Sequence, residues 1–276
     1  MFMSNNNNNS QVSKEHLAYL KKIKHRRIAI RVTQIAILVV FLAIWETAAR
    51  LKWIDAFITS QPTRIWATLV RLHLNGELYR HISVTIFETI IGFTLGTLIG
   101  TFIAIILWWS DFLSKVTDPY LVVLNSLPKV ALGPIIIVWI GAGPLSIIVM
   151  ALLVSIIVTV IGVLNGFLEV SPDKIKLLKT FGATKMQVLT KVVLPASIPT
   201  IISALKINVG MSWVGVIVGE FLVSKAGLGY LAVYGGQVFQ LDLVMTSVVI
   251  LMVAAALMYQ GVAWLEKRYM KGRRSE

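Results

Sequence analysis

The sequence contains no cysteine, and only 14% of its 276 residues are charged. Without cysteine the chain has no disulfide framework, no thiolate nucleophile and no cysteine-ligated metal. It also lacks a G-x-x-x-x-G-K-[ST] loop, so it has no P-loop to hold ATP phosphates. No H-E-x-x-H motif, Ser-His-Asp set or pair of intramembrane aspartates marks a site for chemistry, and the four histidines lack metal-ligand spacing. These absences predict a protein that is not itself an enzyme and that binds no metal.

Acidic residues are scarce, with 13 Asp and Glu against 26 Lys and Arg, which gives a formal net charge of +13. Such an excess can indicate nucleic-acid binding, but here the charges lie between long apolar runs and not along one polar face. The chain is 57% hydrophobic, which is typical of a membrane protein. We therefore expect membrane lipids, and not nucleic acid, around it.

Six hydrophobic runs approach or exceed the ~20 residues that a helix needs to cross about 30 Å of hydrocarbon. Because lipid offers no hydrogen-bond partners to the backbone, each run is expected to be an α-helix. The predicted fold class is an all-α polytopic membrane protein with six transmembrane helices, over residues 32–49, 82–107, 119–140, 147–167, 198–222 and 243–265. Pro128 and Pro134 are expected to break the third of these spans.

The spans predict three parts of the chain: a cytoplasmic tail over residues 1–31, a transmembrane domain over 32–265 and a basic cytoplasmic tail over 266–276. In the first tail we expect a disordered start over residues 1–11, which include five consecutive asparagines, and then a short basic helix on the membrane surface. No internal boundary is expected within the transmembrane domain.

Three of the links between spans also carry a prediction. Pro62, followed by apolar residues on one helical face, predicts an interfacial helix that ends near Gly76. Residues 111–119, before the third span, are expected to be a short turn. The glycine-rich link over residues 224–242 is expected to be a connection between spans five and six.

Lys and Arg favour one orientation of these spans. With the amino terminus in the cytoplasm, 18 of the 26 basic residues fall on the cytoplasmic side, in agreement with the positive-inside rule. An even number of spans then requires that the carboxyl terminus is cytoplasmic as well.

A basic, amphipathic segment over residues 169–195 separates the fourth span from the fifth. In it, Gly182 is followed by nine residues, then by an aliphatic residue, one further residue, and Leu194-Pro195. Gly182 allows a sharp turn, and Pro195 is expected to end the loop helix. Apolar pairs at helical spacing are expected to enter a cleft in a partner, and they are Leu177 with Phe181 and Ile175 with Leu178. The alternative is a basic loop that only obeys the positive-inside rule.

This spacing resembles the EAA loop of ABC importer permeases, whose role in that family is to receive a separate ATPase subunit. Segments 126–143 and 219–230 resemble signatures of the nitrate, sulfonate, taurine and thiamine-precursor permeases, and the resemblance runs from about Trp45 to the end of the chain. There are two departures from the family pattern. Lys176-Leu177-Leu178 stands in place of Glu-Ala-Ala, and Glu88 stands where many sulfonate-type members have arginine.

The resemblance implies a type I ABC importer permease fold, a homodimer in the bacterial inner membrane, and alternating access driven by two ATPase subunits. Those subunits would hold ATP and Mg²⁺, so the chain itself needs no cofactor, and an external solute-binding protein would deliver the solute. The implied ATPase-docking residues are Lys176, Leu178, Phe181, Gly182, Ala183, Thr184, Leu194 and Pro195. The solute is open between a small anion (sulfonate, nitrate or taurine) and a vitamin precursor.

Four of the charged residues within the spans need an explanation, because a charge costs about 2.5 kcal/mol or more at mid-bilayer on insertion scales. They are Glu88, Lys129, Lys206 and Glu220. One hypothesis pairs Glu88 with Lys206 between helices. The other places charges on a translocation path lined by Lys129, Asn208, Trp213 and Glu220.

An ion-gradient-driven secondary transporter that acts without an ATPase is the alternative function. It predicts internal repeats and broken helices at matched positions in the two halves of the chain. Only the third span has broken-helix character. A membrane scaffold without transport would leave the loop over residues 169–195 without a role.

Overall fold

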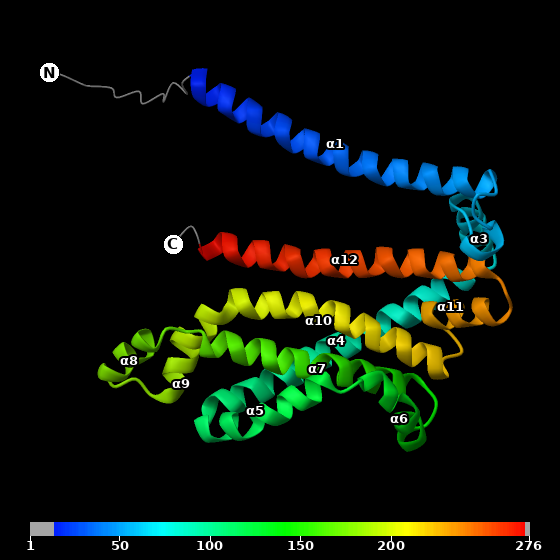
Figure 1. Ribbon diagram of the computed structural model, residues 1–276. Helices are drawn as coiled ribbons and strands as arrows, with labels where there is room; N and C mark the ends of the chain where they lie inside the picture. The colour runs from blue at the N-terminus through cyan, green and yellow to red at the C-terminus, as the bar shows by residue number, and fades with distance from the viewer. Residues whose placement is uncertain (1–13, 274–276) are drawn as a thin grey trace. The chain divides into compact units, whose positions relative to one another are not determined.

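The computed structural model of the protein describes residues 14–273, and all the regular elements in that range are helices (Figure 1). The expected disordered start over residues 1–11 and the last three residues of the basic tail lie outside the described range. Contacts divide the chain into two compact units, residues 1–63 and 64–276. This boundary falls inside the segment 32–265, for which a single domain was expected, and each unit is therefore described by itself.

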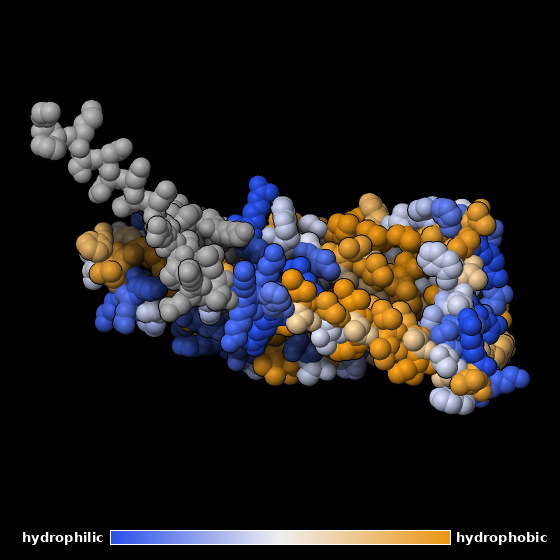
Figure 2. Space-filling view, turned by 90° about the horizontal axis from the view of Figure 1, so that it is seen from above, coloured by the Kyte–Doolittle hydropathy of each residue, from blue (hydrophilic) through white to orange (hydrophobic). Residues whose placement is uncertain are grey.

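The first unit consists mainly of one long helix, α1 (Lys14–Arg50). The separate surface helix expected before the first span is therefore wrong. No proline or glycine occurs between residues 14 and 50, so nothing in the sequence interrupts the helix. Apolar side chains along its second half, among them Ile35, Leu38 and Phe41, are exposed. Figure 2 shows hydrophobic side chains gathered in a broad band that is flanked by hydrophilic surface, as a membrane protein requires.

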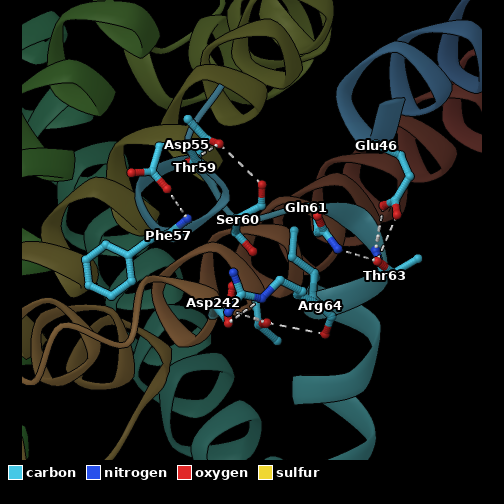
Figure 3. Close-up of polar contacts among 11 residues, drawn as sticks. Glu46, Asp55, Phe57, Thr59, Ser60, Gln61, Thr63, Arg64 and Asp242 are labelled. Carbon is cyan, nitrogen blue, oxygen red and sulfur yellow. Dashed lines mark hydrogen bonds and ion pairs between the residues drawn. The ribbon is translucent and has the colours of Figure 1, made fainter. Parts of the chain in front are cut away.

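The end of this unit is tied together by two acidic side chains (Figure 3). Glu46 accepts hydrogen bonds from Arg50 Nε at 2.7 Å, from the Thr63 amide at 3.1 Å and from the Thr63 hydroxyl at 2.9 Å. Asp55 caps the short helix α2 (Ala56–Thr59) by accepting from the Phe57 amide at 2.8 Å. Such an acceptor stabilises a helix start, because the first amides have no partner within the helix.

The second unit contains the remaining spans and the links between them. Its elements are α3 (Pro62–Leu74, with its first two residues in the first unit), α4 (Glu77–Trp109), α5 (Asp111–Ser126), the 3-10 helix η1 (Lys129–Leu132), α6 (Gly133–Ile140), α7 (Pro144–Leu168), α8 (Pro172–Thr180), α9 (Lys185–Val188), the π-helix η2 (Leu189–Val193), α10 (Leu194–Val223), α11 (Leu228–Gln237) and α12 (Leu241–Arg273). Across the described residues, five helices are long and apolar enough to cross a membrane. A bent helix pair makes a sixth candidate span, which confirms the predicted number.

The bent pair is the third span, over residues 111–126 and 129–140, and its two parts meet at 83°. The break lies at Pro128, as expected, whereas Pro134 lies in the first turn of α6 and breaks nothing. The turn expected over residues 111–119 is wrong, because α5 already begins at Asp111. Ser110 supplies the signal for this start, since its side chain accepts a hydrogen bond from the Leu113 amide at 3.2 Å.

The helix expected from Pro62 is confirmed as α3, which starts at Pro62 and buries one face. Its place at the membrane interface stays a prediction. It ends before Gly76, whose φ of +74° is left-handed. Arg64 at its start forms an ion pair with Asp242 of α12 over 3.2 Å (Figure 3). The glycine-rich link over residues 224–242 was expected to be a connection only, but it contains α11. Leu228 and Leu231 of α11 join a buried core with side chains of α3, α4, α10 and α12.

Close packing of α7 against α4 and α10 organises the unit. Three glycines spaced by four residues on α4 meet three small side chains of α7, and the pairs are Gly92 with Ala151, Gly96 with Ser155 and Gly100 with Thr159. On the other side, a Cβ placed on Gly215 of α10 would lie 2.5 Å from the Ala151 Cα. Since lipid provides no hydrophobic driving force between helices, this close backbone approach is what holds them together.

We predict that Gly215→Ala destabilises the protein by about 1–3 kcal/mol, because the added methyl group collides with the backbone of α7. Gly210→Ala on the same helix is the matched control, since a Cβ there meets nothing within 4 Å. It is expected to leave stability unchanged or to raise it by up to about 1 kcal/mol through helix propensity. Thermal unfolding in mild detergent measures both variants, and equal effects would contradict the packing account.

Candidate functional site

The loop between α7 and α10 contains α8, α9 and η2, and it lies at one end of the unit, opposite the end that holds α6 and α11 (Figure 1). α8 begins at Pro172 in its first turn, with Asp173 beside it. Both residues suit a helix start, because proline has no amide to satisfy there and a carboxylate complements the helix dipole.

Gly182 ends α8 in a Schellman motif. Its φ is +78°, its amide donates to the Lys179 carbonyl at 3.0 Å, and the Ala183 amide donates to the Leu178 carbonyl at 3.1 Å. The left-handed backbone is the reason that glycine is needed at this position. A side chain would have room, since nothing lies within 4 Å of a Cβ placed there. The sharp turn predicted from the sequence is therefore confirmed.

The next helix continues from the loop into the membrane without a stop. Thr184 caps α9 by accepting from the Gln187 amide at 3.3 Å, and the Gln187 side chain accepts from the Thr184 amide at 2.8 Å. Residues 185–223 then form one span-length helix. Pro195 was expected to end the loop helix, and this is wrong. The π-helical stretch η2 ends at Val193, shortly before Pro195. It accommodates the change in helical geometry there, so that α9 and α10 remain joined.

The inner face of the loop is part of a hydrophobic core. Val188, Leu189 and Val193 are buried against Leu107 of α4 and Phe167 of α7. Leu178 and Ile175 are half-buried and pack against the same core. This pair was expected to enter a cleft in a partner, and that stays a prediction, because both side chains also pack against the protein's own core.

The outer face of the loop leaves apolar side chains without cover among the described residues. Phe181 is 81% exposed, Leu177 56% and Met186 57%. Lysines surround them on the same helices, at positions 174, 176, 179 and 185. An exposed apolar patch with a polar rim is the usual sign of a surface that another protein covers. Leu177 and Phe181 are therefore accessible, and their contact with a partner stays a prediction.

Lys185 fixes the loop to the end of α4, a role not foreseen from the sequence. Its ammonium donates to the Trp109 carbonyl at 2.5 Å. It also lies 5.9 Å from the ring centre of Trp108 and 5.6 Å from that of Trp109. A lysine complements the partial negative charge at a helix carboxyl end, and the two indole rings add cation–π attraction. Two tryptophans at the end of a span were the sequence signal for such a partner.

A second candidate site is a buried polar cluster at the opposite end, centred on Glu220 of α10. Its carboxylate accepts from the Thr85 hydroxyl at 2.6 Å and from the Gly229 amide at 2.5 Å. Thr85 in turn accepts from the Leu228 amide at 2.7 Å. A Cβ on Gly227 would lie 2.4 Å from the Glu220 carboxylate, so glycine allows the chain to approach it. The cluster therefore links α4, α10 and the start of α11.

His81 completes this cluster one turn before Thr85. Its Nδ1 lies 2.9 Å from the Gly227 amide nitrogen and 3.1 Å from the Gly227 carbonyl oxygen, and its ring stacks on Tyr230. Neither His81 nor Thr85 was among the predicted site residues. The signal in the sequence was polar residues at i, i+4 and i+7 (His81, Thr85 and Glu88) on an otherwise apolar span.

Glu88 and Lys206 do not form the pair that we expected. The Lys206 ammonium bonds to Glu266 of α12 at 2.5 Å, and the Glu88 carboxyl contacts that of Glu220. The reason is that Glu88 on α4 and Lys206 on α10 lie at different heights along the two helices. Asn208 of α10 bonds to Thr97 of α4 at 3.0 Å, and Glu88 precedes Thr97 by nine residues, which is about 13 Å of helix.

The four residues expected on a translocation path are not brought together. Three of them lie on α10 and are buried inside one subunit, namely Asn208, Trp213 and Glu220. Lys129 lies in η1 at the break of the third span, is half-buried, and bonds to the Asn125 carbonyl at 3.1 Å. These contacts contain no nucleophile paired with a base, so the arrangement supports structure or binding and not catalysis.

The class of protein that this fold defines is a polytopic membrane protein with up to six helical spans among the described residues. A family model described as "Binding-protein-dependent transport system inner membrane component" matches residues 96–271. The chain belongs to that family of ABC importer permease subunits, and it has the type I fold. Members are the transmembrane component of the transporter and are not themselves catalytic, which decides against the secondary-transporter alternative.

Similar proteins include the putative aliphatic sulfonates transport permease protein SsuC of Bacillus subtilis, with 30% identity over 86% of each chain. A probable ABC transporter permease protein of Haemophilus influenzae is 32% identical over 84% of this chain and 94% of its own length. The formylaminopyrimidine transport permease protein ThiX of Halalkalibacterium halodurans is 26% identical over 68% of this chain and 75% of its own.

Among solved structures, a chain of a bacterial alginate ABC transporter in complex with an alginate-bound periplasmic protein superposes with a TM-score of 0.60. It has 16% identity and covers 91% of this chain and 98% of its own. At this identity the likeness shows the fold alone.

We predict that Thr85→Val destabilises the protein by about 1–3 kcal/mol. The change removes the hydroxyl that bonds to Glu220 and to the Leu228 amide, so both buried groups lose a hydrogen-bond partner. Thr89→Val is the matched control. Thr89 is equally buried, but its hydroxyl bonds only to the carbonyl of Thr85 in the same helix. Thermal unfolding of both variants in one detergent checks the prediction. Equal losses would show that the cluster does not link the helices.

A double-mutant cycle tests the observed partner of Lys206. Lys206→Met and Glu266→Gln are each expected to lower the unfolding temperature, and the double variant should lose less than the sum, because the two side chains share one ion pair. Lys206→Met combined with Glu88→Gln should show additive effects. If the second pair were coupled and the first were not, the assignment of the ion pair would be refuted.

Proposed function

We propose that two copies of this chain form the path by which a small solute, delivered by an external binding protein, crosses the membrane. Two separate ATPase subunits would bind ATP and Mg²⁺ and dock at the loops over residues 169–195. The observation that carries this proposal is the two-sided loop. Its inner face is buried in the permease core, and its outer face exposes Leu177, Phe181 and Met186.

The eight predicted docking residues divide between these two faces. Four are exposed and available to a partner, namely Lys176, Phe181, Gly182 and Thr184. The other four are half-buried and set the position of the loop, namely Leu178, Ala183, Leu194 and Pro195. Because lysine replaces the acidic residue of the family pattern at position 176, the cleft on this ATPase should offer acidic groups around an apolar centre.

The continuous helix from Lys185 to Val223 supports a mechanism by alternating access. A force on α9 would reach α10 directly, because no flexible linker separates them. The polar cluster around Glu220 lies near the far end of the same helix. Movement of the ATPase pair would then turn the spans as rigid bodies around the solute path.

In the proposed orientation both termini and the α8–α9 end lie in the cytoplasm of a bacterial cell, and the α11 end lies outside. Residues 1–31 and 266–276 would be the cytoplasmic tails. The names of two relatives support a sulfonate or an aminopyrimidine derivative as the solute. Lys129, Asn208, Trp213 and Glu220 are proposed to face the path in another state of the transport cycle, since three of them are buried here.

Assembly with an ATPase tests the docking proposal. The chain is co-expressed with the ATPase encoded nearest to its gene and purified in mild detergent. Gly182→Val should reduce the ATPase that co-purifies at least tenfold, because a β-branched residue does not tolerate the left-handed backbone at this turn. Gly182→Asn is the matched control, since asparagine tolerates it, and it should keep a two-to-two complex.

Insertion is followed separately by the amount and unfolding temperature of the permease itself, which should stay near wild type in both variants. Retention of the ATPase at wild-type stoichiometry by Gly182→Val would refute the docking assignment. A permease that purifies without any ATPase in its wild-type form would refute the proposed function as a whole.

A further inference from the structure

A cavity of about 390 Å³ opens at the α11 end of the second unit. Three segments line it: α4 with Val84 and Glu88, the turn before α7, and the link between α10 and α11 over residues 223–226. This volume is within the range of cavities that hold small organic molecules. Most of the wall is apolar, as such sites usually are, with few polar groups to orient a ligand.

Glu88 is a polar residue of this wall with one carboxylate oxygen that lacks a hydrogen-bond partner in the described part of the chain. The residue is only 2% exposed, and its Oε2 has no hydrogen-bond partner among the described residues. A buried acceptor that stays unsatisfied destabilises a structure. Glu220, which contacts Glu88, is already engaged with Thr85 and the Gly229 amide. No protein donor therefore fills the position in front of Oε2 in this structure.

We propose that this cavity is a subsite for the nitrogen donor group of the transported solute, an amine, amidine or aminopyrimidine N–H, with Glu88 as its acceptor. The proposal rests on the proposed function and deepens it, because it names the chemical group that the permease recognises. An anion without such a nitrogen has no group to donate to the Glu88 carboxyl in this wall.

Lys225 lies at the cavity as well, and it is exposed. It would complement the acidic end of a zwitterion while Glu88 receives the amino end. A sulfonate that carries an amine thus fits the cavity, whereas the same sulfonate without the amine lacks the group that Glu88 needs. This difference provides matched ligand pairs for a test.

Saturation-transfer-difference NMR on the complex in lipid nanodiscs detects weak ligands directly and needs no transport. Two pairs of probes differ only by an amino group: taurine with ethanesulfonate, and 4-amino-2-methylpyrimidine with 2-methylpyrimidine. For at least one pair, the amino member should give a signal about fivefold or more above that of its partner. Wild-type protein with no such preference in either pair would overturn the proposal.

Glu88→Met should abolish the preference for the amino compound. Glu77→Met is the control, because Glu77 is an exposed acid on the same helix that does not line this cavity. An unchanged preference in Glu88→Met would overturn the proposal, as would an equal loss in both variants. The wild-type pair comparison remains decisive if Glu88→Met does not fold. Co-purification of the ATPase is recorded for the same samples, so failure of the proposed function is seen separately from failure of this subsite.

Discussion

The approach of α10 to α7 is the contact on which the rest of the structure depends. Glycines on α10 bring its backbone against Ala151 and Ile147 of α7, closer than any side chain would permit. α4 meets α7 in the same way from the other side. Because these three helices pack by shape in a lipid environment, their register is fixed by small residues and not by a hydrophobic driving force.

That register determines what lies at each end of α10. At one end, the helix continues through η2 and α9 into the loop, whose inner face completes the core with α4 and α7. At the other end, Glu220 of α10 lies opposite Thr85 of α4, and Glu88 of α4 lies at the edge of a cavity. One helix, over residues 185–223, thus connects the proposed docking surface with the proposed solute subsite. A rigid secondary element of this kind can carry coupling between two distant sites.

Local signals predicted a large part of this fold. The length of the apolar runs predicted the spans, Pro62 and Gly76 predicted both ends of α3, and Gly182 predicted the sharp turn of the loop. These features depend on residues close in sequence. The start of α5 depended on the Ser110 cap, which was overlooked. α11 is rich in glycine and becomes a helix through its packing against α12, so local propensity did not reveal it.

Pairing between helices could not be predicted in the same way. Opposite charges suggested Glu88 with Lys206, but which residues meet depends on the relative height of α4 and α10, set by glycine contacts far from either charge. The same holds for Lys185, whose partner at Trp109 is distant in sequence. The two faces of the loop also required the structure, because Leu177 and Leu178 are adjacent and equally apolar, yet only one of them is exposed.

The central claim is that the outer face of the loop receives the ATPase. The chain has no cysteine, so a single Phe181→Cys substitution places one photoactivatable maleimide label at the centre of that face. Trp139→Cys, at an equally exposed position at the opposite end, is the control. The account predicts a cross-link to the ATPase from position 181 and none from position 139. Equal cross-linking from both positions, or none from position 181 in an intact complex, would contradict it.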